Sequence, residues 1–276
     1  MRKAKRTPNL AGKAQLNISS STKKTMKFSI ITPTYNSAAT LGDTLRSIAS
    51  QTYRDIEHVI VDGASQDDTL SIIDDYSHQY GLNVSLSSEP DKGVYDAMNK
   101  GLRRASGEII GIINSDDFLA DETVIADIAA CFRDDPGLDA CYGDLRYVDR
   151  QETGKIVRFW KAGKYRESKL KNGWTIPHPS FFVRRQVYRQ YGGFNPDFQI
   201  AGDYELILRF LKVHGIKVAY LPRTLACMRA GGLSSRNLRQ RRQGWHELRL
   251  AWKINGLCVP PFFLLRRVLG KLGQYI

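Results

Sequence analysis

Three short polar segments hold the residues best suited to chemistry. They are Thr32-Pro33-Thr34-Tyr35-Asn36, Asp62 with Ser65 and Asp67, and Asn114-Ser115-Asp116-Asp117. Each follows an apolar run that predicts a strand, and the ligands of a parallel sheet bind beyond the carboxyl ends of its strands. Adjacent carboxylates at such a boundary repel each other unless a cation or a hydrogen-bond donor neutralises them. Helix capping would also explain the Asp116-Asp117 pair, but its place beside two other polar segments favours a divalent metal ion that bridges substrate phosphates.

Two common phosphate-binding motifs are missing from the sequence. The first predicted strand is not followed by GxGxxG, and no GxxxxGK[ST] segment occurs, so a Rossmann dinucleotide site and a P-loop lose their main support. Any phosphate of the ligand must then be bound by other means. A metal ion at Asp116 and Asp117 would provide them.

Residues 28 to 133 alternate predicted strands with predicted helices, the order that builds a parallel sheet covered by helices. We predict strands at 28–32, 56–61, 82–88 and 108–113 and helices at 39–51, 67–80, 93–105 and 121–133, the last with Asp121 as its N-cap. Residues 138 to 228 differ, with short strands at 140–147 and 156–160, aromatic loops and a helix at 203–214. Because no linker divides them, we expect the two halves, 27–135 and 136–235, to share one sheet.

The composition fits a folded α/β protein of 276 residues, 42% of them hydrophobic. The four cysteines fall at wide spacings without a CxxC pair, which argues against a disulfide framework and a structural zinc site and favours a reducing cytosol. The longest apolar stretch, 257–265, contains two prolines and is shorter than the roughly 20 residues of a membrane-spanning helix. We therefore predict that no segment crosses a membrane.

The net charge of +13 is concentrated at the two ends of the chain. Residues 1–27 hold eight Lys and Arg and no acid, and residues 229–276 hold ten with one acid, which leaves 23 bases against 27 acids between them. A nucleic-acid enzyme more often carries its basic residues across the working face, so we expect no nucleic-acid partner. Charge at the ends suits an anionic membrane surface better. Residues 1–26 are predicted to be a disordered basic tail, and Met26 is an alternative start.

Five segments with characteristic spacing lie along residues 27 to 235. They are Ser29-Ile-Ile-Thr-Pro-Thr-Tyr-Asn36, Val59-Ile-Val-Asp-Gly-Ala-Ser-Gln-Asp-Asp-Thr69, Glu89-Pro-Asp-Lys-Gly-Val-Tyr-Asp-Ala-Met-Asn-Lys-Gly101, Asn114 to Asp117, and Gly202-Asp-Tyr-Glu-Leu206. In this order they resemble family 2 of the glycosyltransferases, most closely its bacterial members that build surface polysaccharides. The resemblance implies a GT-A fold with a mostly parallel sheet, a nucleotide-diphosphate sugar donor, Mn²⁺ or Mg²⁺, and inversion at the anomeric carbon.

The same resemblance assigns roles to individual residues. Thr32, Pro33 and Tyr35 would line the nucleoside pocket, Thr32 through its backbone and hydroxyl, and Asp62 would help to hold the nucleoside. Gly63 stands where family members often carry a second acid that reads the base, so the base stays open, with UDP favoured. Asp116 and Asp117 match the metal and ribose acids, in an order left open because Asn114 replaces an acid. Asp203 matches the catalytic base, with Gly202 in place of a Glu.

Four more residues are weaker candidates. Lys92 would contact phosphate, although a solvated surface lysine is the alternative. His178 lies between two prolines and would touch the diphosphate or the acceptor, although a loop histidine is often structural. Trp174 and Glu205 would contact the acceptor, although an aromatic residue of the second half is often part of the core. For Asp203 the alternative is a helix N-cap.

Residues 236–276 are predicted to form a basic, amphipathic helical tail, with Trp245, Trp252 and Phe262 beside several arginines. This pattern is typical of helices that lie on a membrane surface, and it predicts a cytoplasmic enzyme held peripherally at the inner face of the cell membrane, with a saccharide or lipid-linked saccharide as acceptor. The alternative is a helix packed on the catalytic body. Two other classes stay open at this point: a nucleic-acid-binding or modifying protein, and an inactive, membrane-docked scaffold of the same fold.

Overall fold

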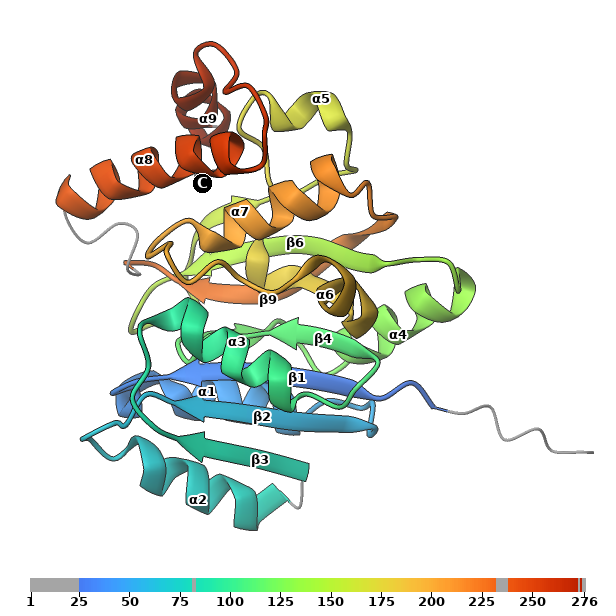
Figure 1. The fold of residues 1–276 in the computed structure, drawn as a ribbon. Helices are drawn as coiled ribbons and strands as arrows, with labels where there is room; N and C mark the ends of the chain where they lie inside the picture. Colours follow the sequence, from blue (N-terminus) through green and yellow to red (C-terminus); the bar gives the residue numbers. More distant parts are fainter. Residues whose placement is uncertain (1–24, 81–82, 232–237, 273, 275–276) are drawn as a thin grey trace, which may run out of the picture.

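The computed structural model describes residues 25–80, 83–231, 238–272 and 274. Within these ranges nine strands form one sheet in the order β3-β2-β1-β4-β8-β6-β9-β5, with β7 added through β6. The strands are β1 (Phe28–Thr34), β2 (Ile56–Asp62), β3 (Asn83–Ser88), β4 (Ile109–Ile112), β5 (Asp117–Leu119), β6 (Ala140–Val148), β7 (Ile156–Trp160), β8 (Phe181–Arg184) and β9 (Val218–Arg229). Both halves of the chain therefore contribute to a single sheet (Figure 1).

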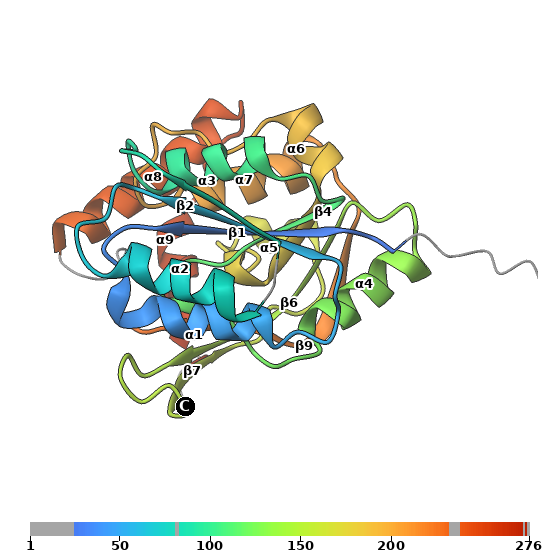
Figure 2. The ribbon, with the colours of Figure 1, turned by 90° about the horizontal axis from the view of Figure 1, so that it is seen from below.

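Helices cover both faces of this sheet. They are α1 (Ala38–Ala49), α2 (Thr69–Tyr80), α3 (Val94–Arg104), α4 (Val124–Asp134), α5 (Glu167–Leu170), α6 (Arg185–Tyr191), α7 (Gly202–Leu208), α8 (Leu238–Ile254) and α9 (Phe263–Leu272), with a 3₁₀ turn η1 (His178–Ser180) and a π-helical turn η2 (Arg209–Val213). Figure 2 shows α3, α6, α7 and α8 on one face and α1, α2 and α4 on the other. Strands covered on both faces are mainly apolar, and all seven residues of β1 are buried, Ser29, Thr32 and Thr34 among them.

The first half of the sheet is parallel, as predicted, and the second half is mixed. β3, β2, β1 and β4 run in the same direction. β8 then joins β4 and β6 in antiparallel pairing, whereas β6 and β9 are parallel. In the register of β1 and β2, Thr34 lies opposite Asp62, so both strands end at the same level and their polar loops begin side by side.

The predicted helices depart most from the structure at α4 and α7, whereas the bounds of α1, α2 and α3 differ by one or two residues. The helix after β5 begins at Val124 with Thr123 as its N-cap, not Asp121. The Asp121 carboxylate instead accepts a hydrogen bond from the Thr123 amide at 3.0 Å and forms an ion pair with Arg223, so the acid fixes the turn that precedes the helix. The helix expected at 203–214 is divided into α7 and the π-helical turn η2.

The last two helices pack on the body of the protein beyond α7 (Figure 1). Leu248 and Trp252 of α8 are buried, and the indole N–H of Trp252 donates to the Tyr204 hydroxyl at 2.9 Å. The buried Glu247 carboxylate accepts the backbone N–H groups of Ile200 and Ala201, immediately before α7. The packed-helix alternative therefore holds for the inner side of α8. Nearly all of the predicted tail at 1–26 lies outside the described residues.

Candidate active site

Hydrogen bonds join the three polar segments at the carboxyl ends of the parallel strands. The Asn36 amide donates to Ser65 Oγ at 2.8 Å, which connects the loops after β1 and β2. The Ser37 and Ser115 hydroxyls lie 2.8 Å apart and connect the loops after β1 and β4. The convergence expected from the sequence is thus present, and it results from strands that share one direction and end together.

Asp117 is a buried carboxylate whose hydrogen bonding is incomplete. Its side chain is 0% exposed, and one oxygen accepts the Asn114 side-chain N–H at 3.0 Å. The second oxygen, Oδ1, and Oδ1 of Asn114 are buried and have no hydrogen-bond partner among the described residues. Burial raises the pKa of Asp117 well above its usual range, and the neighbouring charge of Asp116 adds to this effect. Two unsatisfied buried oxygens are suited to bind a hard divalent cation.

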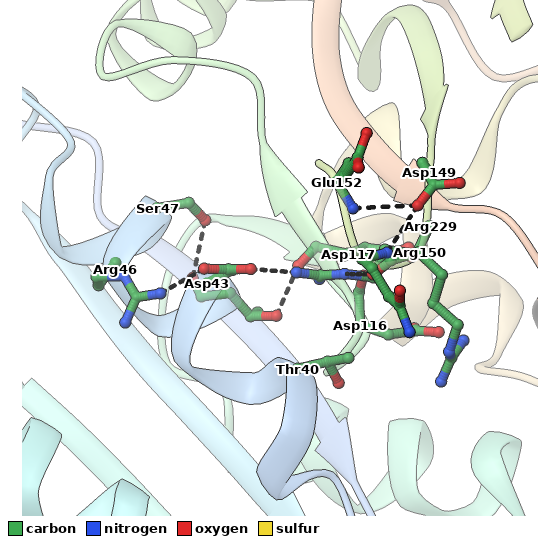
Figure 3. A network of polar contacts seen from close by, with 12 residues as sticks. Thr40, Asp43, Arg46, Ser47, Asp116, Asp117, Asp149, Arg150, Glu152 and Arg229 are labelled. Carbon is green, nitrogen blue, oxygen red and sulfur yellow. Dashed lines mark hydrogen bonds and ion pairs between the residues drawn. The ribbon is translucent and has the colours of Figure 1, made fainter. Parts of the chain in front are cut away.

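Arg229 of β9 holds the turn that carries these acids (Figure 3). Its side chain is buried, donates to the backbone oxygen of Asp116 at 2.9 Å and to that of Arg150 at 3.2 Å, and pairs with Asp43 of α1. The side-chain hydrogen bonds of Arg229 near the acids go to backbone oxygens, and its charge lowers the pKa of Asp117 without offsetting the effect of burial. Arg229 was not predicted from the sequence, because it lies more than a hundred residues from Asp116.

On the other side of these loops, Tyr35 and Asp91 form an exposed corner. The Tyr35 ring is 63% exposed. A Cβ placed on Gly63 would lie 2.6 Å from Asp91 Oδ2 and 3.2 Å from Tyr35 Cδ2. The space beside Gly63 is therefore filled by the carboxylate of Asp91, whose Oδ1 accepts the Gly93 amide at 2.8 Å. Asp91 was not among the site residues predicted from the sequence, because its approach to Gly63 depends on the fold.

The Thr32 hydroxyl, which was expected to contact the nucleoside, is buried in the core. The side chain is fully buried, and Thr32 Oγ1 lies 2.9 Å from His58 Nε2, whose other ring nitrogen contacts the Tyr76 hydroxyl at 3.1 Å. Because side chains alternate along a strand, this hydroxyl points into the core on the α2 side. Burial lowers the pKa of His58 to about 3, so the ring is neutral in this contact.

Asp62 and Pro33 are also buried where their strands end. Asp62 accepts the Ser65 amide at 2.9 Å and the Ser88 hydroxyl at 2.7 Å. Asp62 therefore shapes the loop between β2 and α2, beside the corner formed by Tyr35 and Asp91. Pro33 lies opposite Val61 in the pairing of β1 and β2.

Asp203 lies on the other side of the same edge, in the first turn of α7. Its carboxylate is partly exposed and accepts the Tyr95 hydroxyl of α3 at 3.4 Å. The N-cap of α7 is Ala201, so Asp203 is not the cap. A Cβ on Gly202 would come within 2.8 Å of the Tyr95 ring, which explains why no Glu precedes Asp203 in this chain.

A row of side chains across the sheet connects the two acidic regions. Asp117 pairs with Met228, Met228 with Tyr147, and Tyr147 with Arg158. Residues directly opposite one another on neighbouring strands share a face of the sheet. Burial raises the pKa of Tyr147, the charges of Asp117 and Asp203 raise it further, and Arg158 lowers it. The charges of Asp117 and Asp203 thus both act on Tyr147.

The weaker candidates have different surroundings. His178 is buried, packs edge-on against Phe194 and has its pKa lowered by burial and raised by Asp203. Lys92 is exposed. Both oxygens of the buried Glu205 are bound by Arg209, and one also by Asn255, which favours a structural role. Trp174 donates its indole N–H to the backbone oxygen of Ala162 at 2.8 Å and packs on the core.

Comparison with known proteins identifies the family. The family model described as glycosyl transferase family 2 matches residues 29–192. The chain belongs to this family. A "PGL/p-HBAD biosynthesis glycosyltransferase" of Mycobacterium bovis is 32% identical over 209 residues, which are 75% of this chain and 79% of the relative. The chondroitin synthase of Escherichia coli is 31% identical over 72% of this chain, but only 28% of the synthase is covered.

Solved glycosyltransferases share the fold. S. aureus TarS 1-349 in complex with UDP-GlcNAc has a TM-score of 0.65 and 20% identity and covers 87% of this chain and 69% of that chain. The mannosyltransferase PcManGT from Pyrobaculum calidifontis, in complex with GDP-Man and Mn2+, has a TM-score of 0.63 and 22% identity over 90% of this chain and 70% of that chain. This glycosyltransferase therefore has the GT-A fold. It spans 41% of a longer TarS chain.

Proposed function

We propose that this glycosyltransferase moves a sugar from a nucleotide-diphosphate donor, UDP-sugar in the first place, to a hydroxyl of a saccharide or lipid-linked saccharide in surface polysaccharide biosynthesis. The observation that carries the proposal is the pair of unsatisfied buried oxygens on Asp117 and Asn114. They lie on the same edge as the exposed Tyr35 ring, and Asp117 and the partly exposed Asp203 both act on Tyr147. Such an edge offers separate places for a cation, a base and a reacting hydroxyl.

Asp117 and Asn114, with Asp116 beside them, would hold Mn²⁺ or Mg²⁺. When bound, such an ion neutralises the negative charge that develops on a leaving diphosphate. The residues fit this role because a buried carboxylate oxygen without a hydrogen-bond donor, such as Asp117 Oδ1, is costly. Burial and the Asp116 charge also raise the pKa of Asp117, and a cation would offset both effects.

Asp203 would accept the proton of the acceptor hydroxyl. A hydroxyl is a poor nucleophile, and a carboxylate within hydrogen-bond reach accelerates its attack by roughly 10²- to 10⁴-fold. The Tyr95 hydroxyl, 3.4 Å from Asp203 Oδ1, fixes the orientation of the carboxylate. One base opposite the leaving group supports direct displacement: the acceptor oxygen bonds to the anomeric carbon as the bond to the diphosphate oxygen breaks, with inversion.

The corner formed by Tyr35 and Asp91 supports a donor base that carries a ring N–H. The exposed Tyr35 ring provides a face on which a base can stack. An ionised carboxylate is only an acceptor of hydrogen bonds, so Asp91 Oδ2 would accept an N–H of the donor base, such as the ring N–H of uracil, thymine or guanine. UDP is the first candidate among these.

Titration calorimetry of the full chain tests the proposed function. UDP, GDP and dTDP are titrated into the protein with Mn²⁺ and again with EDTA. We expect UDP to bind with Mn²⁺ and its affinity to fall at least tenfold with EDTA, and we expect Asp91→Asn to weaken UDP binding. Equal affinity with Mn²⁺ and with EDTA would remove the metal from the proposal. Equal affinity of Asp91→Asn and wild type would remove Asp91 from base recognition.

We also propose that the outer side of α9 rests on an anionic membrane at the inner face of the cell membrane. Phe262, Leu265 and Leu269 are 73%, 56% and 55% exposed and recur at helical spacing. Phe262 and Leu265 line a groove of about 460 Å³ together with Arg249 and Lys253. Apolar side chains beside cations match a surface of acidic lipids. Among the described helices none is long and apolar enough to span a bilayer.

Vesicle sedimentation tests the membrane proposal. We expect wild type to sediment with vesicles that contain phosphatidylglycerol and not with pure phosphatidylcholine vesicles. Replacing Leu265 and Leu269 with Ser should abolish sedimentation, whereas the matched exchange of Leu86, an exposed leucine of β3, should not. Equal sedimentation of wild type and the Leu265/Leu269 variant would contradict the proposal.

A further inference from the structure

Two residues of α9, Phe263 and Arg267, lie one helical turn apart and pack against the first turn of α7. Phe263 is buried and packs its ring against Tyr204 and Trp252. The Arg267 guanidinium lies over the Tyr204 ring at 5.1 Å from its centroid and donates to the backbone oxygen of Gly173. Tyr204 directly follows Asp203 in the sequence, so Arg267 packs on the turn of α7 that carries the candidate base.

The backbone at Gly173 lies close to the side chain of Arg267. A Cβ on Gly173 would lie 2.4 Å from Arg267 Cβ, and Gly173 has a φ of +76°, a conformation that side chains other than glycine rarely adopt. The site is therefore built to admit the arginine stem between Gly173 and Tyr204. This packing holds the Arg267 guanidinium in one position, unlike the guanidinium of a surface arginine.

The charge of Arg267 is not balanced by an ion pair with any carboxylate of the described residues, among which it contacts the Gly173 oxygen and the Tyr204 ring. Burial lowers its pKa, and the charges of Tyr204, Asp203 and Tyr147 act in the opposite direction. Arg158, in the row of Asp117 and Tyr147, adds a second positive charge in range. A partly buried guanidinium is costly unless an anion approaches it, and guanidinium is the group best shaped to bind phosphate oxygens.

We propose that Arg267 binds a phosphate group of one of the two substrates beside Asp203. The inference rests on the proposed transfer reaction and adds a residue that lies outside the matched family region, which ends at residue 192. The phosphate can come from the donor diphosphate or from the phosphate that links an acceptor saccharide to its lipid. Because α9 carries the exposed apolar residues on its outer side and Arg267 on its inner side, the same helix would meet the membrane and the substrate.

Binding measurements on the full chain separate the two sources. UDP with Mn²⁺ is titrated into wild type, Arg267→Gln and Arg266→Gln. Arg266 is the matched control because it is exposed on the same helix. In a second arm, the thermal stabilisation of the same proteins by farnesyl phosphate is compared with that by farnesol. Loss of one charge-assisted hydrogen-bonding group should weaken phosphate binding by about 10- to 100-fold.

If Arg267→Gln binds UDP more weakly than wild type but farnesyl phosphate equally well, Arg267 binds the donor diphosphate. If Arg267→Gln loses only farnesyl phosphate binding, with farnesol unaffected, Arg267 binds the acceptor phosphate. If wild type and Arg267→Gln bind both probes equally, the proposal is overturned while the proposed function stands. If wild type fails to bind UDP with Mn²⁺, the proposed function itself fails. Should Arg267→Gln not fold, Arg267→Met keeps the apolar stem on Tyr204 and gives the same comparison.

Discussion

Replacing Asp117 with Asn should make the metal-free protein more stable while it abolishes metal-dependent donor binding. In the wild type a fully buried carboxylate has one oxygen without a partner among the described residues, and Asn114 Oδ1 beside it also has none. An amide at position 117 carries no charge, still accepts the Asn114 N–H, and offers its own N–H to the orphan Asn114 oxygen. Satisfying such groups contributes about 1 to 3 kcal/mol, so we expect a gain of that size in the free energy of unfolding.

The gain should grow with pH. The pKa of Asp117 is higher in the folded protein than in the unfolded chain, so the folded state binds the proton more tightly. The free energy of unfolding of the wild type therefore falls as pH rises above the unfolded-state pKa of about 3.9. The fall is about 1.4 kcal/mol per pH unit until the pH reaches the pKa of the folded protein. The amide side chain of the Asp117→Asn variant cannot titrate, so the variant should not show this loss.

Urea unfolding in EDTA at pH 5 and pH 8, repeated at pH 8 with Mn²⁺, measures both effects. Added Mn²⁺ at a hundred times its dissociation constant should stabilise the wild type by about 2.7 kcal/mol and leave Asp117→Asn unchanged. Asp116→Asn, at a partly exposed position, is the control and should change the metal-free stability less. An Asp117→Asn variant that is less stable than wild type in EDTA at both pH values would refute the reasoning.

Three further predictions concern single residues. Asp203→Asn should lower the transfer rate by about 10²- to 10⁴-fold and leave the dissociation constant of the donor unchanged in calorimetry; retained turnover would remove Asp203 from the base role. Tyr35→Ala should weaken UDP binding by about 1 to 3 kcal/mol if the base stacks there, and an unchanged affinity would exclude stacking. Burial lowers the pKa of His58 from 6.5 to about 3. As the pH falls below 6.5, His58 therefore becomes protonated in the unfolded chain but not in the folded protein, and the free energy of unfolding should decrease. The loss is about 1.4 kcal/mol per pH unit, and urea unfolding between pH 7 and 4.5 should show a flatter profile for His58→Gln.

The first half of the fold was predictable because its signals are local. β1, β2 and β4 are buried on both faces and therefore appear in the sequence as mainly apolar segments, each followed by polar residues. Parallel strands that end together bring those polar residues to one edge. The positions of Asp116, Asp117 and Tyr35 on this edge follow from these two facts alone.

The parts that could not be predicted depend on contacts between distant segments. Asp91 fills the space left by Gly63 from the loop after another strand. The Thr32 hydroxyl turns inward because His58, on the neighbouring strand, offers it a buried partner. Arg267 reaches the side of Asp203 only because α9 folds back on α7, through Phe263 and Tyr204. No pattern in one segment of sequence specifies such tertiary pairings.

The most direct test of the central claim is an anomalous difference map from a crystal of the full chain soaked with Mn²⁺ and UDP. We expect one manganese peak in contact with Asp117 Oδ1 and Asn114 Oδ1, the uracil ring against Tyr35, and the diphosphate on the side that faces Asp203. A manganese peak at another place, or a nucleotide bound away from the loops after β1 and β4, would contradict the claim.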